Sequence, residues 1–404
     1  ARLASIPEQR YGGFAAAGIA GTRDAGSTRY RLDGEALIGN LLSNSVRITV
    51  LNRRMPTEQH TVEVELQALI AEEGPIPISR FMGLANAAYY SDHDPFGVKG
   101  DFITAPEVSQ MFGELIGLVF ADCWRQAGGE AAYVELGPGR GTLAVDALRS
   151  MALVDLEPPV HFVETSPFLR VSQAEMIPDA IWHDTTATLP TDVPLMIIAN
   201  EFFDAMPVEQ YVKTMLGWRE LMIRHDDIDA FATVPGQTPA EHKIPADLRD
   251  AHTASVYEQS TASRGLMRSL ARRLAKQGGI MIVIDYGYHD RFAGDTLQAV
   301  HAHAYADPFI RPGRSDLTAH VDFSALKRTA QSIKGIRTRG PVDQGDWLVS
   351  IGIDLRADQL TRANPARAAE LAAARMRLIH PDQMGTLFKV MGLSGPHWPL
   401  VPGL

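Results

Sequence analysis

The chain has 404 residues, 45% of them hydrophobic, which is enough for one large or two medium domains with a substantial core. Its single cysteine, Cys123, excludes an internal disulfide framework and a metal site built on several thiolates. The net charge of −10 argues against general nucleic-acid binding, and no apolar run reaches the ~18 to 20 residues that span a bilayer, so we expect a protein or small-molecule substrate.

Residues 1–54 differ in composition from the rest of the chain. They contain eight arginines, no lysine and four acids, and show no sustained periodicity. Organelle-targeting segments are rich in arginine and poor in acids, but the four acids and the lack of an amphipathic helix favour a different interpretation. We therefore predict that residues 1–54 form an appended, flexible segment.

Residues 55–128 are predicted to form a helical N-terminal extension. Apolar residues recur at helical spacing from Val62 and stop at Gly74-Pro75, and a second helix is expected over 79–88. After a loop rich in turn residues, Thr104 and Glu107 form a capping-box pattern that predicts one continuous helix up to Phe120.

The run 135–142, Glu-Leu-Gly-Pro-Gly-Arg-Gly-Thr, follows an apolar stretch and predicts a strand that turns tightly into a helix. Glycines at 137, 139 and 141 let a ligand approach the backbone and the N-terminus of that helix. Glu135 at the mouth of the turn would repel a pyrophosphate, but it suits the ammonium group of S-adenosylmethionine. The alternative is a turn that only joins a strand to a helix.

Two later strands are predicted to end in carboxylates that suit the same cofactor. The strand over 159–163 ends at Glu164, where nucleotide-binding folds place an acid on the ribose hydroxyls. The short strand over 180–183 ends at Asp184, which is a candidate acceptor for the adenine amino group. Asp184 is equally suited to capping the next turn.

The apolar run 194–200 is typical of a parallel strand buried on both faces, and it ends at Asn200, Glu201 and Asp204. Ligands of open α/β sheets bind beyond the carboxyl ends of the strands, so chemistry is expected there. A β-hairpin around Leu216-Gly217 opens an insertion over about 208–263. The catalytic domain is predicted to cover 129–404. Its later part contains a helix near 266–276, a strand over 278–284 that ends at Asp285, and a strand over 387–391.

Several long motifs together resemble the MidA family of S-adenosylmethionine-dependent methyltransferases, over about 62–395. This family includes the mitochondrial complex I assembly factor that methylates arginine, and bacterial relatives. The resemblance implies an α/β fold of class I methyltransferases, with a Rossmann-like seven-stranded sheet. The matching motifs lie at 100–115, 135–142, 200–207, 285–287 and 316–323.

The resemblance also implies roles for single residues. It favours a lid over the cofactor that includes Asp101 and Thr104, and Asn200 is a further candidate for cofactor binding. An arginine acceptor has a guanidinium pKa above ~12, so it is positively charged when it binds. Carboxylates should therefore bind and orient it, and we call these carboxylates the clamp. Glu201 and Asp204 fit that need and Asp285 is a third candidate, whereas His320 is a candidate proton acceptor that is more often structural.

We therefore expect a protein arginine N-methyltransferase that uses S-adenosylmethionine, with a respiratory complex I subunit as a candidate substrate. Two alternatives remain open: a small-molecule methyltransferase, and an assembly factor that binds the cofactor without catalysis. The insertion over 208–263 argues mildly for a larger substrate surface. The expected compartment is the cytoplasm in a bacterium or otherwise the mitochondrial matrix.

Overall fold

The computed structural model describes residues 62–92, 104–226, 230–301 and 304–404. All of them fall within one structural unit, Gln59–Leu404. The expectations for residues 1–54 and for Asp101 lie outside the described residues. No described helix is both long enough and apolar enough to cross a membrane.

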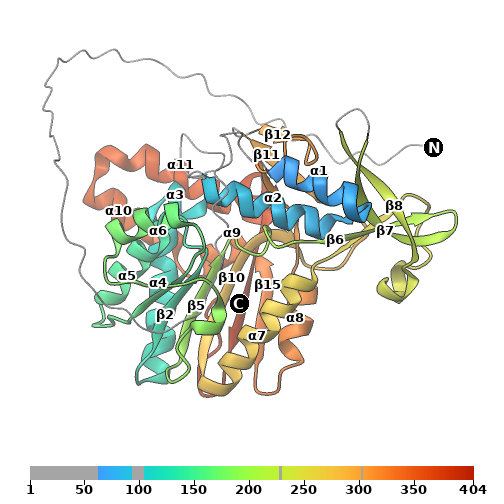
Figure 1. Cartoon of the computed structure of the whole chain (residues 1–404). Helices are drawn as coiled ribbons and strands as arrows, with labels where there is room; N and C mark the ends of the chain where they lie inside the picture. Colours follow the sequence, from blue (N-terminus) through green and yellow to red (C-terminus); the bar gives the residue numbers. More distant parts are fainter. Residues whose placement is uncertain (1–61, 93–103, 227–229, 302–303) are drawn as a thin grey trace, which may run out of the picture. The chain divides into compact units, whose positions relative to one another are not determined.

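A mostly parallel sheet forms the centre of this unit (Figure 1). Its strands are β2 (Ala132–Leu136), β3 (Val160–Val163), β4 (Ile181–His183), β5 (Leu195–Asn200), β10 (Gly279–Tyr288), β14 (Val321–Asp322), β15 (Arg337–Asp343) and β16 (Phe388–Ser394). Seven of them follow the order β15-β16-β10-β5-β2-β3-β4, and β14 pairs with the end of β10. β16 runs antiparallel to both of its neighbours, whereas the pairs from β10 to β4 are parallel. The expected seven-stranded α/β sheet is therefore present.

Helices cover both faces of this sheet, as its sequence pattern requires. Along β10, Ile280, Ile282 and Ile284 face one apolar cluster, and Met281 and Val283 face the other. This alternation explains why β10 is apolar throughout, because each side chain must pack against a helix layer. The helices of the first layer include α4 (Gln110–Ala127), α5 (Thr142–Ala152), α9 (Gln344–Ser350), α10 (Ile353–Ala363) and α11 (Ala368–Ile379). The second layer is formed by α7 (Thr261–Gln277) and α8 (Phe323–Gln331), while α6 (Pro167–Met176) connects β3 to β4.

The N-terminal region is helical, but the single helix expected after Thr104 is wrong. Its helices are α1 (Val62–Glu73), α2 (Ile78–Asp92), the short α3 (Ala105–Val108) and α4. Ser109 is extended, with φ −165°, and its hydroxyl accepts a hydrogen bond from the Met111 amide, so a second helix begins there. The Thr104 side chain makes no capping hydrogen bond, and the Ala105 amide donates to the Glu201 carboxylate.

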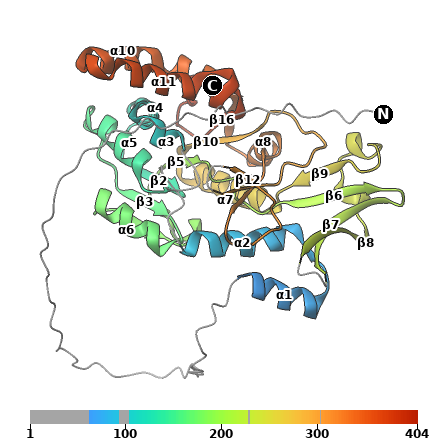
Figure 2. The same ribbon diagram turned by 90° about the horizontal axis from the view of Figure 1, so that it is seen from above.

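The insertion forms a separate antiparallel sheet, in which the hairpin predicted around Gly217 is confirmed. Its strands are β6 (Glu209–Thr214), β7 (Gly217–His225), β8 (Phe231–Pro239), β9 (Val256–Gln259) and the N-terminal β1 (Ile76–Pro77). In Figure 2, β6, β7 and β8 extend to one side of the central sheet. β1 pairs with β7, so the N-terminal region and the insertion pack as one structure. A third sheet contains β11 (Gln298–His301), β12 (Ala304–Ala306) and β13 (Asp316–Thr318).

Candidate functional site

The turn between β2 and α5 has a backbone conformation that favours glycine. Gly137, Gly139 and Gly141 have φ values of +63°, +54° and +86°, which L side chains rarely adopt. A Cβ atom on Gly137 would lie 2.9 Å from the ring of Phe202, so the space is closed as well. Gly141 is the N-cap of α5. The turn therefore exposes backbone amides and a helix N-terminus at the carboxyl edge of the sheet.

A cavity of about 570 Å³ lies on one side of this turn, which is within the usual size range for small-molecule sites. It is bordered by the turn, by the ends of β3 and β4, by α2 and by the segment after β5. Its lining includes the predicted site residues Gly137, Gly139, Glu164, Asp184 and Glu201. The structure thus brings together five residues from four separate parts of the sequence.

Glu164 is buried at the inner end of this cavity. One carboxylate oxygen accepts a hydrogen bond from the Ser166 amide at 2.8 Å, and the other accepts one from the Gln173 amide group at 3.3 Å. Gln173 also donates to the Gly139 carbonyl at 2.7 Å, so it joins the glycine turn to Glu164. Burial raises the pKa of Glu164, which partly favours its neutral form. A role on the ribose hydroxyls stays a prediction for this residue.

Asp184 lies at the rim of the cavity in a different environment. Its side chain is 81% exposed and pairs with the Arg170 guanidinium at 2.5 Å. Arg170 in turn donates to the Glu164 carbonyl at 3.0 Å, so the two strand ends are linked. The charge of an exposed, paired carboxylate contributes little to the free energy of an interaction. Its proposed contact with adenine stays a prediction.

A second, smaller cavity of about 40 Å³ is also lined by the glycine turn. It shares Gly137, Gly139 and Glu201 with the large cavity, so the two adjoin. Thr104, Glu135 and Asn200 also line it, together with Arg140. Apart from Gly141, the predicted cofactor residues that the structure describes therefore line two adjoining cavities at one turn.

Glu135 and Asn200 give the small cavity its chemistry. Glu135 is only 3% exposed, and burial raises its pKa to about 8, although the Tyr133 hydroxyl donates to it at 2.7 Å. The Asn200 carbonyl oxygen is buried and has no hydrogen-bond partner among the described residues. Buried polar atoms without a partner are rare in native proteins. Two adjacent acceptors with unused capacity fit the ammonium group of S-adenosylmethionine.

Glu201 occupies a strained position between the two cavities. It is not glycine, yet its φ is +50°, a conformation that costs about 1–3 kcal/mol and is concentrated at functional sites. One carboxylate oxygen accepts hydrogen bonds from the Ala105 amide at 3.1 Å and from the Asn200 side chain at 3.2 Å. Burial, followed by the nearby Asp204 charge, raises the pKa of Glu201 to about 7.

Asp285 holds the backbone that carries Glu201. Its fully buried carboxylate accepts hydrogen bonds from the amides of Phe202, Phe203, Asp204 and Tyr286, at 3.2, 2.9, 3.3 and 3.0 Å. Burial, together with the charges of Asp204 and Glu201, raises the pKa of Asp285 well above its usual range. Asp285 does not line either cavity beside the glycine turn. Its contacts give it a positioning role.

Asp204 lies behind the same turn. Its carboxylate accepts hydrogen bonds from the Ala205 amide at 2.7 Å and from the Tyr286 hydroxyl. Burial raises the pKa of Asp204 to about 6. Asp204 is not in the lining of the two cavities, so in this structure only Glu201, of the two predicted clamp residues, faces them.

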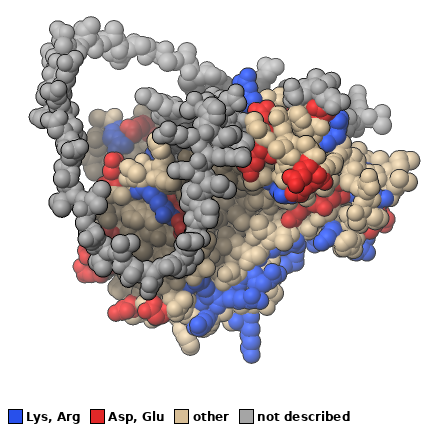
Figure 3. All heavy atoms as spheres, viewed as in Figure 1, with Lys and Arg blue, Asp and Glu red and all other residues tan. Residues whose placement is uncertain are grey.

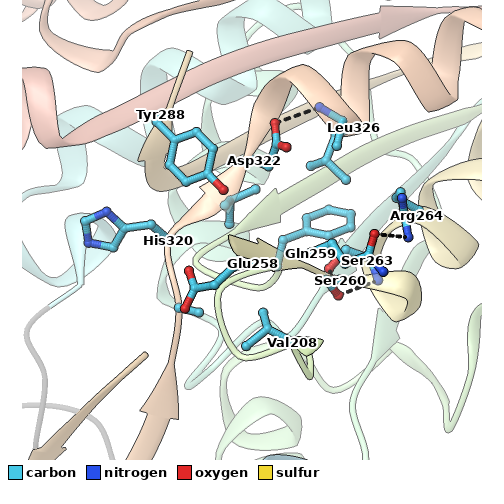
Figure 4. A pocket seen from close by; sticks show the side chains of 14 residues that line it. Val208, Glu258, Gln259, Ser260, Ser263, Arg264, Tyr288, His320, Asp322 and Leu326 are labelled. Carbon is cyan, nitrogen blue, oxygen red and sulfur yellow. Dashed lines mark hydrogen bonds between the residues drawn. The ribbon is translucent and has the colours of Figure 1, made fainter. Parts of the chain in front are cut away.

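His320 is not brought to the glycine turn. Its amide donates to the Thr296 hydroxyl at 2.9 Å, and its ring packs edge-on against Tyr286, with 5.5 Å between the ring centroids. It lines a third cavity of only about 30 Å³ (Figure 4), where its imidazole points away from Ser263 and Arg264. Burial lowers the pKa of His320, which favours the neutral ring.

Sequence reasoning missed the residues that connect the site. Gln173 bridges Glu164 and Gly139 from α6, and Phe202 closes the space beside Gly137. Tyr286 contacts both Asp204 and His320. Tyr286 follows the predicted Asp285 directly and could have been found from that position. No local pattern marks Gln173.

Comparisons with known proteins agree with this site. The sequence profile of a family described as S-adenosyl-L-methionine-dependent methyltransferase matches residues 115–342. The chain is 36% identical to protein arginine methyltransferase NDUFAF7 of Rattus norvegicus, over 85% of this chain and 86% of the relative. It is 37% identical to the Homo sapiens protein of that name, over 83% of each chain. It is 34% identical to the Drosophila melanogaster homolog, over 81% of this chain and 84% of the relative.

Solved structures show the same similarity in three dimensions. A crystal structure from Burkholderia thailandensis bound to S-adenosyl-homocysteine has a TM-score of 0.76 and 29% sequence identity to this chain. The similarity covers 85% of this chain and 93% of that one. The cofactor is therefore S-adenosylmethionine, whose demethylated product occupies the similar structure. The chain belongs to the MidA family of S-adenosylmethionine-dependent methyltransferases.

Proposed function

We propose that this methyltransferase acts on arginine side chains of a protein, in a step linked to the assembly of respiratory complex I. The relatives named as protein arginine methyltransferases are 34–37% identical to it over more than four-fifths of the chain. The link to complex I rests on the family resemblance. The observation that carries the proposal is the position of the Glu201 carboxylate, which lines both cavities beside the glycine turn.

Within this proposal, the predicted cofactor-binding residues would contact two different ends of S-adenosylmethionine. Glu164, in the large cavity, would accept hydrogen bonds from the ribose, and Asp184 at its rim would meet the adenine. Glu135 and Asn200, in the small cavity, would hold the ammonium group. The bound cofactor supplies a methyl group on a positively charged sulfur atom. The acceptor nitrogen would attack the methyl carbon, and the sulfur would leave as a neutral thioether. The in-line geometry of that displacement makes positioning the main contribution of the protein.

Glu201 suits an arginine acceptor for two reasons. A guanidinium is cationic at neutral pH, so a buried carboxylate both binds it and fixes its orientation. Methylation at nitrogen also releases a proton, and a carboxylate with a pKa of about 7 accepts one readily near neutral pH. Asp285 maintains the strained backbone of Glu201, and Asp204 adds negative charge behind it.

The proposal is tested by incubating the purified protein with S-adenosylmethionine that carries a labelled methyl group and with a cell lysate. We expect label in protein, which mass spectrometry then assigns to individual residues. Label confined to small metabolites would replace the proposal with a small-molecule methyltransferase. Tight cofactor binding without transfer to any lysate component would support an assembly factor that does not catalyse.

A further inference from the structure

The outer side of α7 carries an uninterrupted row of cations. Arg264, Arg268, Arg272 and Lys276 recur every fourth residue, and this spacing places side chains on one face of a helix. The seventeen residues of α7 also include Arg273 and contain no aspartate or glutamate. Figure 3 shows a continuous basic area at the bottom of the molecule, where Figure 1 places α7. We call Arg264, Arg268, Arg272 and Lys276 the α7 row.

No carboxylate of the described residues pairs with the outer part of this row. Arg268, Arg272 and Lys276 are exposed, and among the described residues none of the three forms an ion pair or a side-chain hydrogen bond. The Arg264 guanidinium donates only to neutral oxygens, those of Gln259 at 3.1 Å and Thr261 at 3.3 Å. The chain as a whole has a net charge of −10, so this unneutralised positive charge is local.

The row lowers the stability of its own helix. Each pair of like charges four residues apart costs about 0.2–0.5 kcal/mol, and the row contains three such pairs. Arg264 also lies in the first turn, where the helix dipole disfavours a cation. Lys276 lies in the last turn, where the dipole favours a cation, so the cost comes from the repulsion along the row and from Arg264. A bound anionic partner would offset this repulsion.

Two grooves beside α7 give such a partner a surface to occupy. One, of about 500 Å³, is lined by the α7 residues from Gly265 to Gln277 and by Thr191. The other, of about 360 Å³, lies between α7 and α8 and adds Arg328, whose side chain is 52% exposed and lies 4.0 Å from the Asp322 carboxylate. Arg268 lines both grooves, whereas Arg272 and Lys276 line the first and Arg264 lines the second.

The row leads toward the cofactor edge of the sheet. At the start of α7, the Ser260 hydroxyl donates to the Pro207 carbonyl at 2.8 Å, and the Thr261 amide donates to Glu209 at 3.1 Å. Pro207 belongs to the segment that follows Glu201. Lys276 follows Arg264 by twelve positions, or about 18 Å of helix, which matches about five or six residues of an extended peptide.

We propose that the α7 row docks an acidic segment of the protein methyl acceptor; this inference rests on the proposed function. The surrounding chemistry favours a polypeptide over other anions. No large apolar side chain of α7 or α8 is exposed, so the surface lacks the apolar face that inserts into a membrane. Neither helix presents an exposed aromatic ring on which a base of single-stranded RNA would stack.

The test measures binding without methyl transfer. A fluorescent twelve-residue peptide of alternating glutamate and glycine, with no arginine, is titrated with the full chain at about 0.05 M salt, where exposed charges are weakly screened. We expect saturable binding that weakens as salt is added, and no binding of the same peptide with glutamine in place of glutamate. The variant Arg268→Glu/Arg272→Glu should weaken binding at least ~10-fold.

Two controls separate charge from fold. Arg362→Glu/Arg377→Glu makes the same change in net charge on exposed residues of α10 and α11, which pack on the other face of the sheet, and should retain affinity within about twofold. Arg268→Lys/Arg272→Lys keeps the charge and should retain binding. Thermal melts verify that each variant is folded.

Each possible outcome supports or overturns the proposed docking. Loss of peptide binding in Arg268→Glu/Arg272→Glu, but not in the controls, supports it. Failure of the native chain to bind the glutamate peptide, or equal loss in both charge-reversed variants, overturns it. Tighter binding of single-stranded RNA or of vesicles containing anionic lipid would also overturn it and reassign the surface. Because no arginine is present, these outcomes do not depend on whether the proposed methyl transfer occurs.

Discussion

The backbone amide of Ala105 donates a hydrogen bond of 3.1 Å to the Glu201 carboxylate. This contact joins the N-terminal helices to the turn that follows β5, across 96 positions of sequence. It pairs the amide of the first residue of α3 and fixes one oxygen of Glu201. With Asp285 holding the next three backbone amides, the strained Glu201 conformation is set by two distant parts of the chain.

The first prediction separates catalysis from cofactor binding. We expect Glu201→Gln to preserve S-adenosylmethionine affinity and to lower methyl transfer at least ~100-fold, comparable to the loss of a key electrostatic contact. The amide keeps the shape and removes the charge. Calorimetry measures the affinity, and single-turnover kinetics measure the transfer.

A matched control for that variant is Glu220→Gln, which changes a half-buried carboxylate of the insertion whose pKa is also raised. It should leave both quantities unchanged. If the double variant Glu201→Gln/Asp204→Asn transfers methyl groups at the native rate, the two acids are structural and the clamp interpretation fails.

The pH dependence of the reaction should reflect Glu201. Because burial raises its pKa to about 7, the charged form that binds a guanidinium predominates only above that value. The acceptor guanidinium stays protonated throughout this range. We therefore expect kcat/KM to rise as the pH increases from 6 to 8 and then to level off, and Glu201→Gln to lose this inflection. A native profile that is flat between pH 6 and 8 would contradict this assignment.

Cofactor binding should release a proton near neutral pH. With a pKa of about 8, Glu135 is mostly protonated at pH 7, and an incoming ammonium group favours its charged form. Calorimetry at pH 7 in two buffers of different ionisation enthalpy should detect release of up to about one proton, and affinity should increase with pH.

Substitution tests which carboxylate releases this proton. Glu135→Gln should abolish the release and, at pH 8, weaken binding by up to about 3 kcal/mol, the upper end of the range for hydrogen bonds to charged groups. The exposed Glu130→Gln, just before β2, is the control and should change neither result. Equal proton release by the native chain and Glu135→Gln would assign the titration to another group.

The glycine turn can be tested by a pair of valine substitutions. Gly139→Val introduces a side chain beside the cavities, and we expect it to abolish cofactor binding in calorimetry. Gly128→Val is the control, since its φ of +73° is equally unfavourable but the space around it is open and it ends α4. Each variant should lose about 1–3 kcal/mol of stability. Unchanged affinity in a folded Gly139→Val variant would remove the turn from the cofactor site.

Much of the fold could be predicted because its signals are local. The parallel strands β5 and β10 are recognisable as apolar runs, since both of their faces are buried, and the hairpin at Gly217 follows from its turn residues. Contacts between distant residues could not be predicted in this way. The helix break at Ser109 follows a segment whose Ala105 amide donates to Glu201, and the His320 ring packs against Tyr286.

The same distinction applies to the site. Glu135, Glu164 and Asn200 were identifiable because each lies at or next to the end of a strand, where an α/β sheet binds its ligands. Gln173 was not, because it lies within a helix and reaches Gly139 and Glu164 only through the tertiary fold. Asp204 and Asp285 were predicted to contact the substrate because each follows a buried strand. In the structure neither residue lines the two cavities beside the glycine turn.

The central claim is that this chain transfers a methyl group to arginine in protein. The most direct measurement is complete hydrolysis of protein that the native chain has labelled from S-adenosylmethionine, followed by chromatography of the labelled amino acids. We expect the label to elute as methylated arginine and Glu201→Gln, assayed in parallel, to yield at most about 1% of it. Label in a different amino acid, or the same yield from Glu201→Gln, would contradict it.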